Sequence, residues 1–223
     1  MSDFEIFVNF KTYLQATGEN GIRLAQVCEQ VRKEYKIKVT PIVQSVDLAP
    51  IVGSINIPVW LQHLDFQPQG KYTGWQNIEA ALGRGAGGTL LNHSEHPLPP
   101  GTIKQILARI RTAVGKNGDF KTMLCGKTLG QLERLVKFKP DYVAYEISEL
   151  IGGDISTVDY APEPIKHAIG ICEKIPLVVG AGISKPEDLV VAKKLGASGV
   201  LISSAVVLAE NPKQTLIKLI KDL

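Results

Sequence analysis

Residues 176–195 read PLVVGAGISKPEDLVVAKKL, and this stretch contains the pattern that decides the fold. It opens with a continuous apolar run that ends at Gly180, which is typical of a strand in a parallel sheet covered on both faces. A glycine-containing turn follows, and Pro186 then stands where a helix often places a proline in its first turn. The stretch therefore predicts one β-strand, one short loop and one α-helix.

The same strand-then-helix unit occurs eight times along the chain. The expected strands are 5–10, 38–43, 58–63, 88–92, 121–125, 142–145, 176–180 and 199–203. The expected helices are 21–35, 46–53, 77–83, 103–114, 129–136, 162–172, 186–195 and 212–223. Eight such units predict an α/β fold, the (β/α)8 TIM barrel, as one domain over residues 1–223. An open doubly wound sheet would carry a glycine fingerprint after its first strand, whereas this chain has Asn9, Phe10 and Lys11 there.

The composition is ordinary for a globular domain, with 44% hydrophobic residues, 21% charged residues and a net charge of +3. We expect no nucleic-acid partner because Lys and Arg form no dense block. We expect no membrane insertion because the longest apolar runs fall well short of the roughly 20 residues of a membrane span. The acidic start, MSDFEIF, is unlike a signal peptide and indicates a cytoplasmic protein. The three scattered cysteines, Cys28, Cys125 and Cys172, predict buried free thiols.

A barrel of this kind places its functional residues after the carboxyl ends of its strands. The polar residues in those positions are Asn9, Lys11, Asn92, His93, Ser94, Glu95, Glu146, Ser184, Ser203 and Ser204. A carboxylate such as Glu146 can remove a proton next to a carbonyl, and an imidazole such as His93 can hydrogen-bond the carbonyl oxygen. The ammonium of Lys11 supplies positive charge, and the glycine-containing turns offer N–H groups to a phosphate. The four histidines lack the spacing of metal ligands, so we expect no metal.

Each of these residues also has an ordinary structural interpretation. Lys11 alone is typical of a solvated loop, His93 of a hydrogen-bonded structural histidine, and Glu146 of a strand-end surface carboxylate. Glu95 could simply favour a helix start, and Gly180 and Gly182 could only make a tight turn. We interpret His63 as structural and His96 and His167 as surface residues. The functional hypothesis is preferred because the strand count places the set together, whatever its members are.

Several motifs resemble the triosephosphate isomerase family of the short, archaeal kind. They are VNFKTY (8–13), TLLNHSEH (89–96), YVAYEISELIG (142–152), VGAGISKPEDL (179–189) and GVLISSAVV (199–207). The segment QHLD (62–65) with the later Thr73 and Gly74 is similar to the third loop of that family. The resemblance implies interconversion of dihydroxyacetone phosphate and D-glyceraldehyde 3-phosphate through an enediolate, in glycolysis and gluconeogenesis, without a cofactor. It also implies a homodimer or homotetramer in which Thr73 and Gly74 enter the partner subunit.

The resemblance further implies a role for each matching residue. Glu146 would be the base, His93 the electrophile and Glu95 a supporting acid, and the family is itself a standard example of a glutamate base with a neutral histidine. The substrate would be contacted by Asn9, Phe10, Lys11, Ile151, Gly152, Gly182, Ser184, Ser203 and Ser204. Among these, Ile151 and Gly152 would belong to a closing lid, and the last four would line the phosphate site.

The chain departs from the family pattern at both ends of the expected lid. Ile147 stands where the family usually has proline, and Gly153-Asp154 follows Ile151-Gly152 where Thr-Gly is usual. Proline would stiffen the first hinge and Gly153 loosens the second, so we expect a less ordered empty lid and weaker substrate binding.

Two other functions fit the same residues less well. One is a phosphate-binding barrel in which Lys11 forms a Schiff base, and the other is a barrel without activity that only binds a ligand or a partner.

Overall fold

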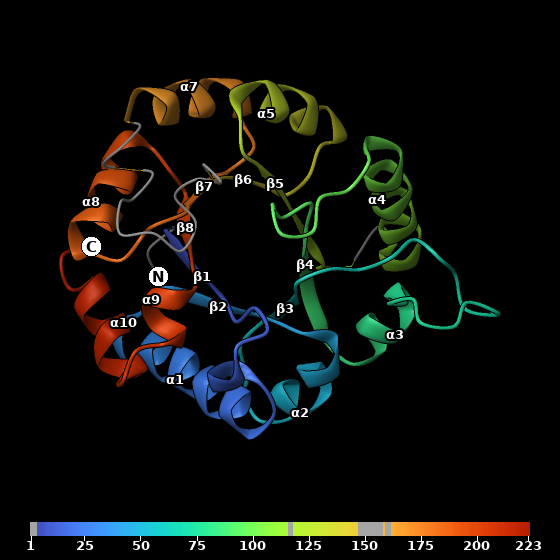
Figure 1. The fold of residues 1–223 in the computed structure, drawn as a ribbon, viewed down its shortest axis with the longest axis horizontal. Coiled ribbons are helices and arrows are strands. Elements are labelled where there is room, and N and C mark those ends of the chain that lie inside the picture. The colour runs from blue at the N-terminus through green and yellow to red at the C-terminus, as the bar shows by residue number, and fades with distance from the viewer. Residues whose placement is uncertain (1–3, 116–117, 147–157, 159–161) are drawn as a thin grey trace.

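The computed structural model describes residues 4–115, 118–146, 158 and 162–223. Eight parallel strands close into a barrel in which each strand pairs with the next and β8 pairs with β1 (Figure 1). The strands are β1 (Glu5–Asn9), β2 (Lys38–Val43), β3 (Val59–Leu61), β4 (Ala86–Leu91), β5 (Lys121–Gly126), β6 (Tyr142–Tyr145), β7 (Leu177–Gly180) and β8 (Gly199–Ile202). The (β/α)8 barrel that the sequence predicts is confirmed.

Helices surround the ring of strands on its outer side (Figure 1). They are α1 (Glu19–Tyr35), α2 (Leu48–Val52), α3 (Ile78–Gly83), α4 (Pro100–Val114), α5 (Leu129–Leu135), α7 (Pro162–Cys172), α8 (Pro186–Leu195), α9 (Ser204–Val207) and α10 (Pro212–Ile220). Short 3-10 turns occupy Leu14–Ala16, Ser45–Asp47 and Val136–Phe138. Within the described ranges, no helix combines the length and apolarity that a membrane crossing requires.

The bounds differ from the expected ones in a few places with clear local causes. The fourth helix begins at Pro100 rather than at Ile103, because a proline lacks the N–H that the first helical turn leaves unpaired. The second helix is split by the 3-10 turn at Ser45–Asp47. The short helix α9 after β8 was not expected from the sequence. The apolar pattern continues from Val200 to Val207 and so does not separate this helix from the strand.

The inside of the barrel is filled by apolar side chains from all eight strands. The buried members of this inner core are Phe7, Ile42, Trp60, Leu90, Met123, Cys125, Ala144, Val178 and Leu201. The rings of Phe7, Trp60 and Tyr142 pack edge-on or tilted, with centroids 5.1 to 5.7 Å apart. Trp60 lies so close to β4 that a Cβ on Gly88 would be 2.4 Å from its ring, which explains the glycine. The barrel is therefore a packed core and not a channel.

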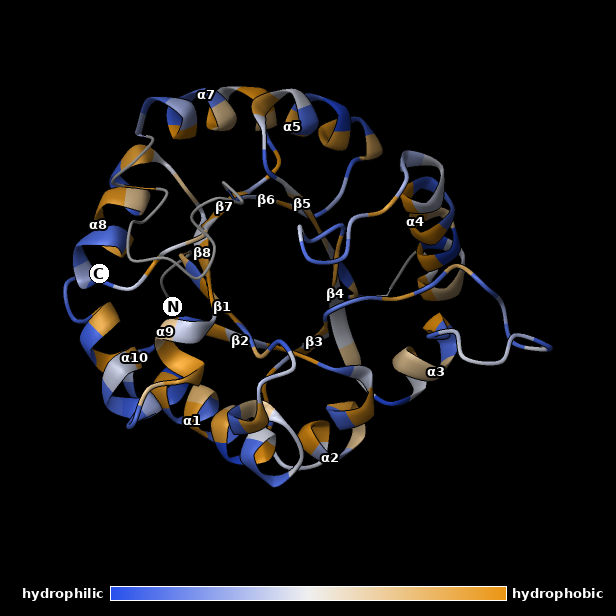
Figure 2. Ribbon diagram, in the orientation of Figure 1, coloured by the Kyte–Doolittle hydropathy of each residue, from blue (hydrophilic) through white to orange (hydrophobic). Residues whose placement is uncertain are grey.

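A second core lies between the outer face of the barrel and the helices. Side chains alternate between the two faces of a strand, so both sets must be apolar, as the orange strands in Figure 2 show. The same figure shows helices with one apolar and one polar side. Cys28, Cys125 and Cys172 are all buried and free, as predicted.

Candidate active site

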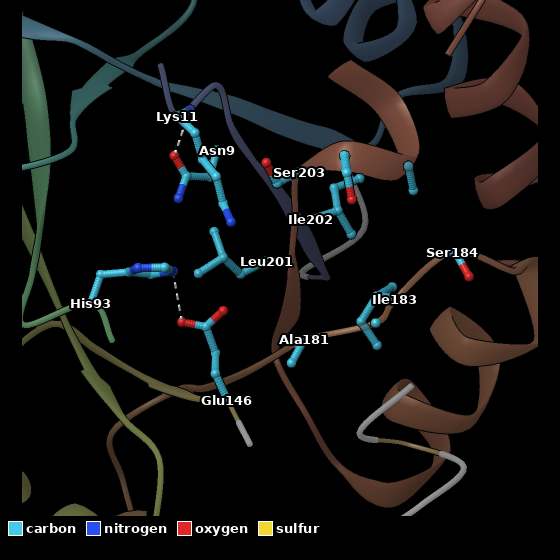
Figure 3. Close-up of a pocket in the computed structure, with 13 residues that line it drawn as sticks. Asn9, Lys11, His93, Glu146, Ala181, Ile183, Ser184, Leu201, Ile202 and Ser203 are labelled. Atoms are coloured by element: carbon cyan, nitrogen blue, oxygen red, sulfur yellow. Dashed lines mark hydrogen bonds and ion pairs between the residues drawn. The ribbon is translucent and has the colours of Figure 1, made fainter. Parts of the chain in front are cut away.

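A cavity of about 260 Å³ opens at the carboxyl ends of the strands. Asn9, Lys11, His93 and Glu146 lie on one side of it, and residues 181–184 and 201–205 lie on the other (Figure 3). A second cavity of about 330 Å³ adjoins the first and shares Asn9, Lys11 and His93 with it. The cavity therefore brings together chain segments from β1, β4, β6, β7 and β8.

Lys11 follows β1 in a left-handed backbone conformation, with a φ of 48°. Residues with a Cβ avoid this region, at a cost of roughly 1–2 kcal/mol. Two hydrogen bonds hold it there: the Lys11 N–H donates to Asn9 Oδ1 at 3.0 Å, and Gln62 Nε2 donates to the Lys11 carbonyl at 2.8 Å. The Lys11 ammonium pairs with Glu95 Oε1 at 2.6 Å. A paired ammonium is suited to stabilising negative charge rather than to attacking a carbonyl, which disfavours the Schiff-base hypothesis.

His93 follows β4 and is buried. The residue before it, Asn92, is also left-handed, with a φ of 59°. The Asn92 side chain spans the turn, since Nδ2 donates to the Cys125 carbonyl and Oδ1 accepts the Leu98 N–H, each at 2.8 Å. The turn thereby fixes the direction in which the imidazole leaves the strand.

The Glu95 N–H lies 3.2 Å from His93 Nδ1 and donates to it. A nitrogen that accepts a hydrogen bond carries no proton, so this contact assigns the proton of the neutral ring to Nε2. Nε2 is the nitrogen that faces Glu146 (Figure 3). Burial lowers the pKa of His93, but the hydrogen bond and the charge of Glu146 outweigh it, and the pKa lies above its usual value. The hydrogen bond from the Glu95 N–H favours the neutral form of His93 instead, because an imidazolium has no lone pair to accept that hydrogen bond.

Glu146 comes directly after β6, and its side chain is buried. Its N–H donates to the Gly126 carbonyl at 3.0 Å, which aligns it with the end of β5. Its Oε2 lies 3.4 Å from His93 Nε2, longer than a strong charge-assisted hydrogen bond. Burial and the nearby Glu146 carboxylate raise the pKa of the Cys125 thiol well above its usual value, so this thiol stays protonated. A weak pair at the edge of a cavity can be separated by an incoming ligand.

The opposite side of the cavity is built from the segments that follow β7 and β8. Ala181 and Gly182 both have a φ of 69°, which turns the chain sharply after β7. The buried Asp188 accepts the N–H groups of Ser184 and Lys185, each at 2.9 Å, and so ties this turn to the start of α8. The Oγ of Ser203 is buried and makes no hydrogen bond with the described residues.

A sequence-family model described as triosephosphate isomerase matches residues 4–223. The chain belongs to the triosephosphate isomerase family. Three similar proteins named triosephosphate isomerase come from the methanogens Methanothermus fervidus, Methanobrevibacter smithii and Methanocaldococcus jannaschii. They are 35%, 33% and 36% identical to this chain over 222 residues, which cover 97–98% of this chain and 98% of each relative. The family resemblance seen in the sequence motifs is thus confirmed, and the chain belongs to a family of isomerases.

Most residues that the triosephosphate isomerase motifs single out meet at this cavity. They are Asn9, Lys11, His93, Glu146, Gly182, Ser184, Ser203 and Ser204. Glu95 lies beside them in the adjoining cavity, where its Oε2 is 3.7 Å from His93 Nδ1 in addition to the Lys11 pair. Ile151 and Gly152, together with Ile147 and Gly153-Asp154, lie outside the described residues.

Phe10 differs from the expectation that it contacts substrate. Its side chain is fully buried in the outer core, and its N–H donates to the Ile42 carbonyl at 2.9 Å. It therefore packs the barrel wall beneath Asn9 and Lys11 and does not line the cavity. A bulky apolar residue between two polar ones at a strand end is a signal of such packing.

Three other residues matter in ways that the motifs did not indicate. Gln62 supports the strained Lys11 backbone, a role that its place in the QHLD segment does not indicate. His63 is buried, with Nε2 3.0 Å from Asp65 Oδ1, and Asp65 Oδ2 in turn accepts the Gln76 N–H. This chain of contacts fixes the stem of the third loop, residues 62–77. His96 and His167 are exposed, as predicted.

Proposed function

We propose that the protein interconverts dihydroxyacetone phosphate and D-glyceraldehyde 3-phosphate, with Glu146 as base and His93 as electrophile. The observation that carries the proposal is the opposed pair of Glu146 Oε2 and His93 Nε2 at one end of the cavity, beside the ammonium of Lys11. Membership of the triosephosphate isomerase family supports the same substrates. The reaction would take place in the cytoplasm, in glycolysis and gluconeogenesis.

In this mechanism Glu146 removes a proton from the carbon next to the substrate carbonyl. The electron pair moves onto the carbonyl oxygen, and the Nε2–H of His93 hydrogen-bonds the resulting enediolate. The acid formed at Glu146 then returns the proton to the neighbouring carbon, while the proton of the substrate hydroxyl passes to the former carbonyl oxygen, so that no atom is gained or lost. Lys11 supplies the positive charge that the enediolate and the phosphate both require.

A neutral His93 is the better electrophile because its Nε2–H hydrogen-bonds the enediolate oxygen without transferring the proton to it. In the empty site, Glu146 raises the pKa of this histidine. A substrate between the two side chains weakens that influence, whereas burial and the Glu95 N–H remain and favour the neutral ring. Binding would therefore prepare the histidine for its role.

The phosphate would lie on the side of the cavity formed after β7 and β8, near Gly182, Ser184, Ser203 and Ser204. The buried Oγ of Ser203, which has no hydrogen-bond partner in the described part of the chain, is a polar atom that such an anion could satisfy. Ile151 and Gly152 would close over the phosphate from the lid.

Self-association is part of the proposal, as a homodimer or a homotetramer. The third loop projects away from the barrel between β3 and α3 (Figure 1), and its Trp75 side chain is 51% exposed. Leu14 and Val46, on other loops at the mouth, are each 77% exposed. In the proposed assembly, these exposed large apolar side chains would be covered by the partner subunit. The tip of the third loop, at Thr73 and Gly74, would enter the cavity of about 330 Å³ on a second copy.

A coupled assay with glyceraldehyde 3-phosphate tests the proposed reaction directly. We expect turnover by the purified protein without added metal or cofactor. Absence of turnover in both directions would favour a barrel that only binds a ligand. Borohydride treatment with substrate should leave Lys11 unmodified, and a trapped lysine adduct would instead support the Schiff-base alternative.

A further inference from the structure

We infer that Gly180 is a positioning residue for Glu146: the absence of a Cβ at Gly180 leaves the space that the glutamate side chain occupies. The inference rests on the proposed role of Glu146 as the base. Gly180 is the last residue of β7, which is paired with β6 so that Val179 lies opposite Tyr145. One residue further along both strands, Gly180 and Glu146 therefore lie side by side.

The distances leave no room for a Cβ unless the Glu146 side chain moves. A Cβ built on Gly180 would be 2.7 Å from both Cγ and Oε1 of Glu146, and 3.0 Å from its Cδ. Carbon atoms in contact normally stay about 3.5–4.0 Å apart. The three nearest heavy atoms all belong to Glu146, so the conflict concerns this side chain before any other part of the protein.

Backbone conformation does not explain the glycine. Gly180 is the final residue of an extended strand and has no left-handed φ, whereas Gly182, two residues later, does. Alanine can adopt the extended conformation without strain. A substitution at Gly180 therefore acts through steric contact with Glu146.

The Glu146 backbone cannot easily retreat, because its N–H is bonded to the Gly126 carbonyl. The side chain must instead rotate away from β7. A small cavity of about 70 Å³, lined in part by Ser94, Cys125 and Gly126, borders Glu146 and offers room for such a rotation. The carboxylate would then leave its place 3.4 Å from His93 Nε2.

The test compares Gly180→Ala with Gly170→Ala. Gly170 lies in α7 and a Cβ there would meet nothing within 4 Å, so this variant is a matched glycine control. We expect Gly180→Ala to lower kcat by about 100-fold, the effect of a misplacement of about 1 Å, with little change in KM. Gly170→Ala should retain the wild-type kcat. An active wild type with an equally active Gly180→Ala variant would overturn this inference alone, whereas an inactive wild type would overturn the proposed function.

A second measurement does not depend on activity. Nitrogen-15 NMR titration of the His93 ring should give a lower pKa in Gly180→Ala than in the wild type, since the displaced carboxylate no longer stabilises the imidazolium. Gly170→Ala should titrate like the wild type. An unchanged His93 pKa in Gly180→Ala would contradict the displacement even if kcat falls.

The double variant Gly180→Ala with Glu146→Ala keeps the added Cβ but removes the glutamate side chain that this Cβ would contact. If the conflict is with the glutamate, this variant folds with the stability of Glu146→Ala, and Gly180→Ala adds no further loss of residual activity. The double variant also keeps the inference testable if Gly180→Ala alone does not fold. Failure of the double variant to fold would place the conflict elsewhere and overturn the inference.

Discussion

The barrel buries one glutamate at each end, and the two are held in opposite ways. At the amino end, both carboxylate oxygens of Glu5 accept hydrogen bonds, from Thr40 Oγ1 at 2.5 Å and from the Tyr142 hydroxyl at 3.3 Å. At the carboxyl end, Oε2 of Glu146 makes no hydrogen bond of ordinary geometry with the described residues. The two residues are equally inaccessible, at 8% and 5% exposure.

The difference lies in what each carboxylate still lacks. A buried polar group with all its partners contributes to folding, whereas an unsatisfied one retains interaction energy that a ligand can use. Burial and the charge of Glu5 raise the pKa of the Tyr142 hydroxyl, which keeps it protonated and donating. In the proposed mechanism, two equally buried glutamates therefore have different roles: Glu5 is structural and Glu146 is chemical.

The largest expected effect comes from Glu146→Gln. An amide cannot accept a proton from carbon, so we expect kcat to fall by about 10³-fold, within the usual range for a lost general base. At about pH 8.5, where the pair with His93 contributes little, stability should not fall, because the substitution removes a buried charge. Steady-state kinetics and urea denaturation measure the two quantities. Full activity in Glu146→Gln would show that Glu146 is not the base, and the proposed contrast with Glu5 would be wrong.

His93→Gln should have the next largest effect. It removes the Nε2–H that would stabilise the enediolate, and the loss of one such donor costs about 10²-fold in kcat. His167→Gln, on the exposed side of α7, is the matched control and should behave like the wild type. Equal activity of the two variants would remove His93 from the mechanism.

Glu5→Gln should reverse the pattern seen for Glu146. One carboxylate oxygen becomes an amide nitrogen that faces a hydroxyl donor, so we expect the free energy of unfolding to fall by about 1–3 kcal/mol with kcat unchanged. Tyr142→Phe removes only the longer of the two hydrogen bonds and should cost about 1 kcal/mol. A loss of activity without a loss of stability in Glu5→Gln would show that the two ends of the barrel are not independent.

The smallest expected effect is on the pH dependence of stability. Because Glu146 raises the pKa of His93, the pair stabilises the folded state below the ordinary histidine pKa and loses this contribution as the pH rises through the raised value. The stability of the wild type minus that of Glu146→Gln should therefore be larger at about pH 6 than at about pH 8.5, by about 1 kcal/mol or less. His93→Gln should give the same trend in urea denaturation. A difference that does not vary with pH would mean that the pair is not formed in solution.

The fold could be predicted because each strand of a covered parallel sheet is a largely apolar run without polar alternation. The placement of Lys11, His93 and Glu146 followed from counting strands, since all eight carboxyl ends face one side. Neither prediction required any knowledge of side-chain contacts.

The contacts themselves could not be predicted. Glu5 and Tyr142 are 137 positions apart, and only the closed ring brings their side chains together inside it. The Gly180 space depends on the register between β6 and β7, which the residue pattern does not specify to within one residue. For Phe10, a substrate contact was predicted that the structure does not show. The motif places Phe10 next to substrate-facing residues, but strand alternation turns its side chain into the core.

The chain contains two tryptophans, and the barrel places them in opposite surroundings. Trp60 is 3% exposed in the aromatic layer of the inner core, whereas Trp75 is 51% exposed on the third loop. Intrinsic fluorescence therefore carries two separable signals, a blue-shifted one from the core and a solvent-quenched one from the loop. In Trp75→Phe, the remaining Trp60 reports unfolding of the barrel. In Trp60→Phe, the remaining Trp75 reports binding of a partner subunit to the third loop. Folding and assembly can therefore be followed by the same fluorescence measurement without a dye.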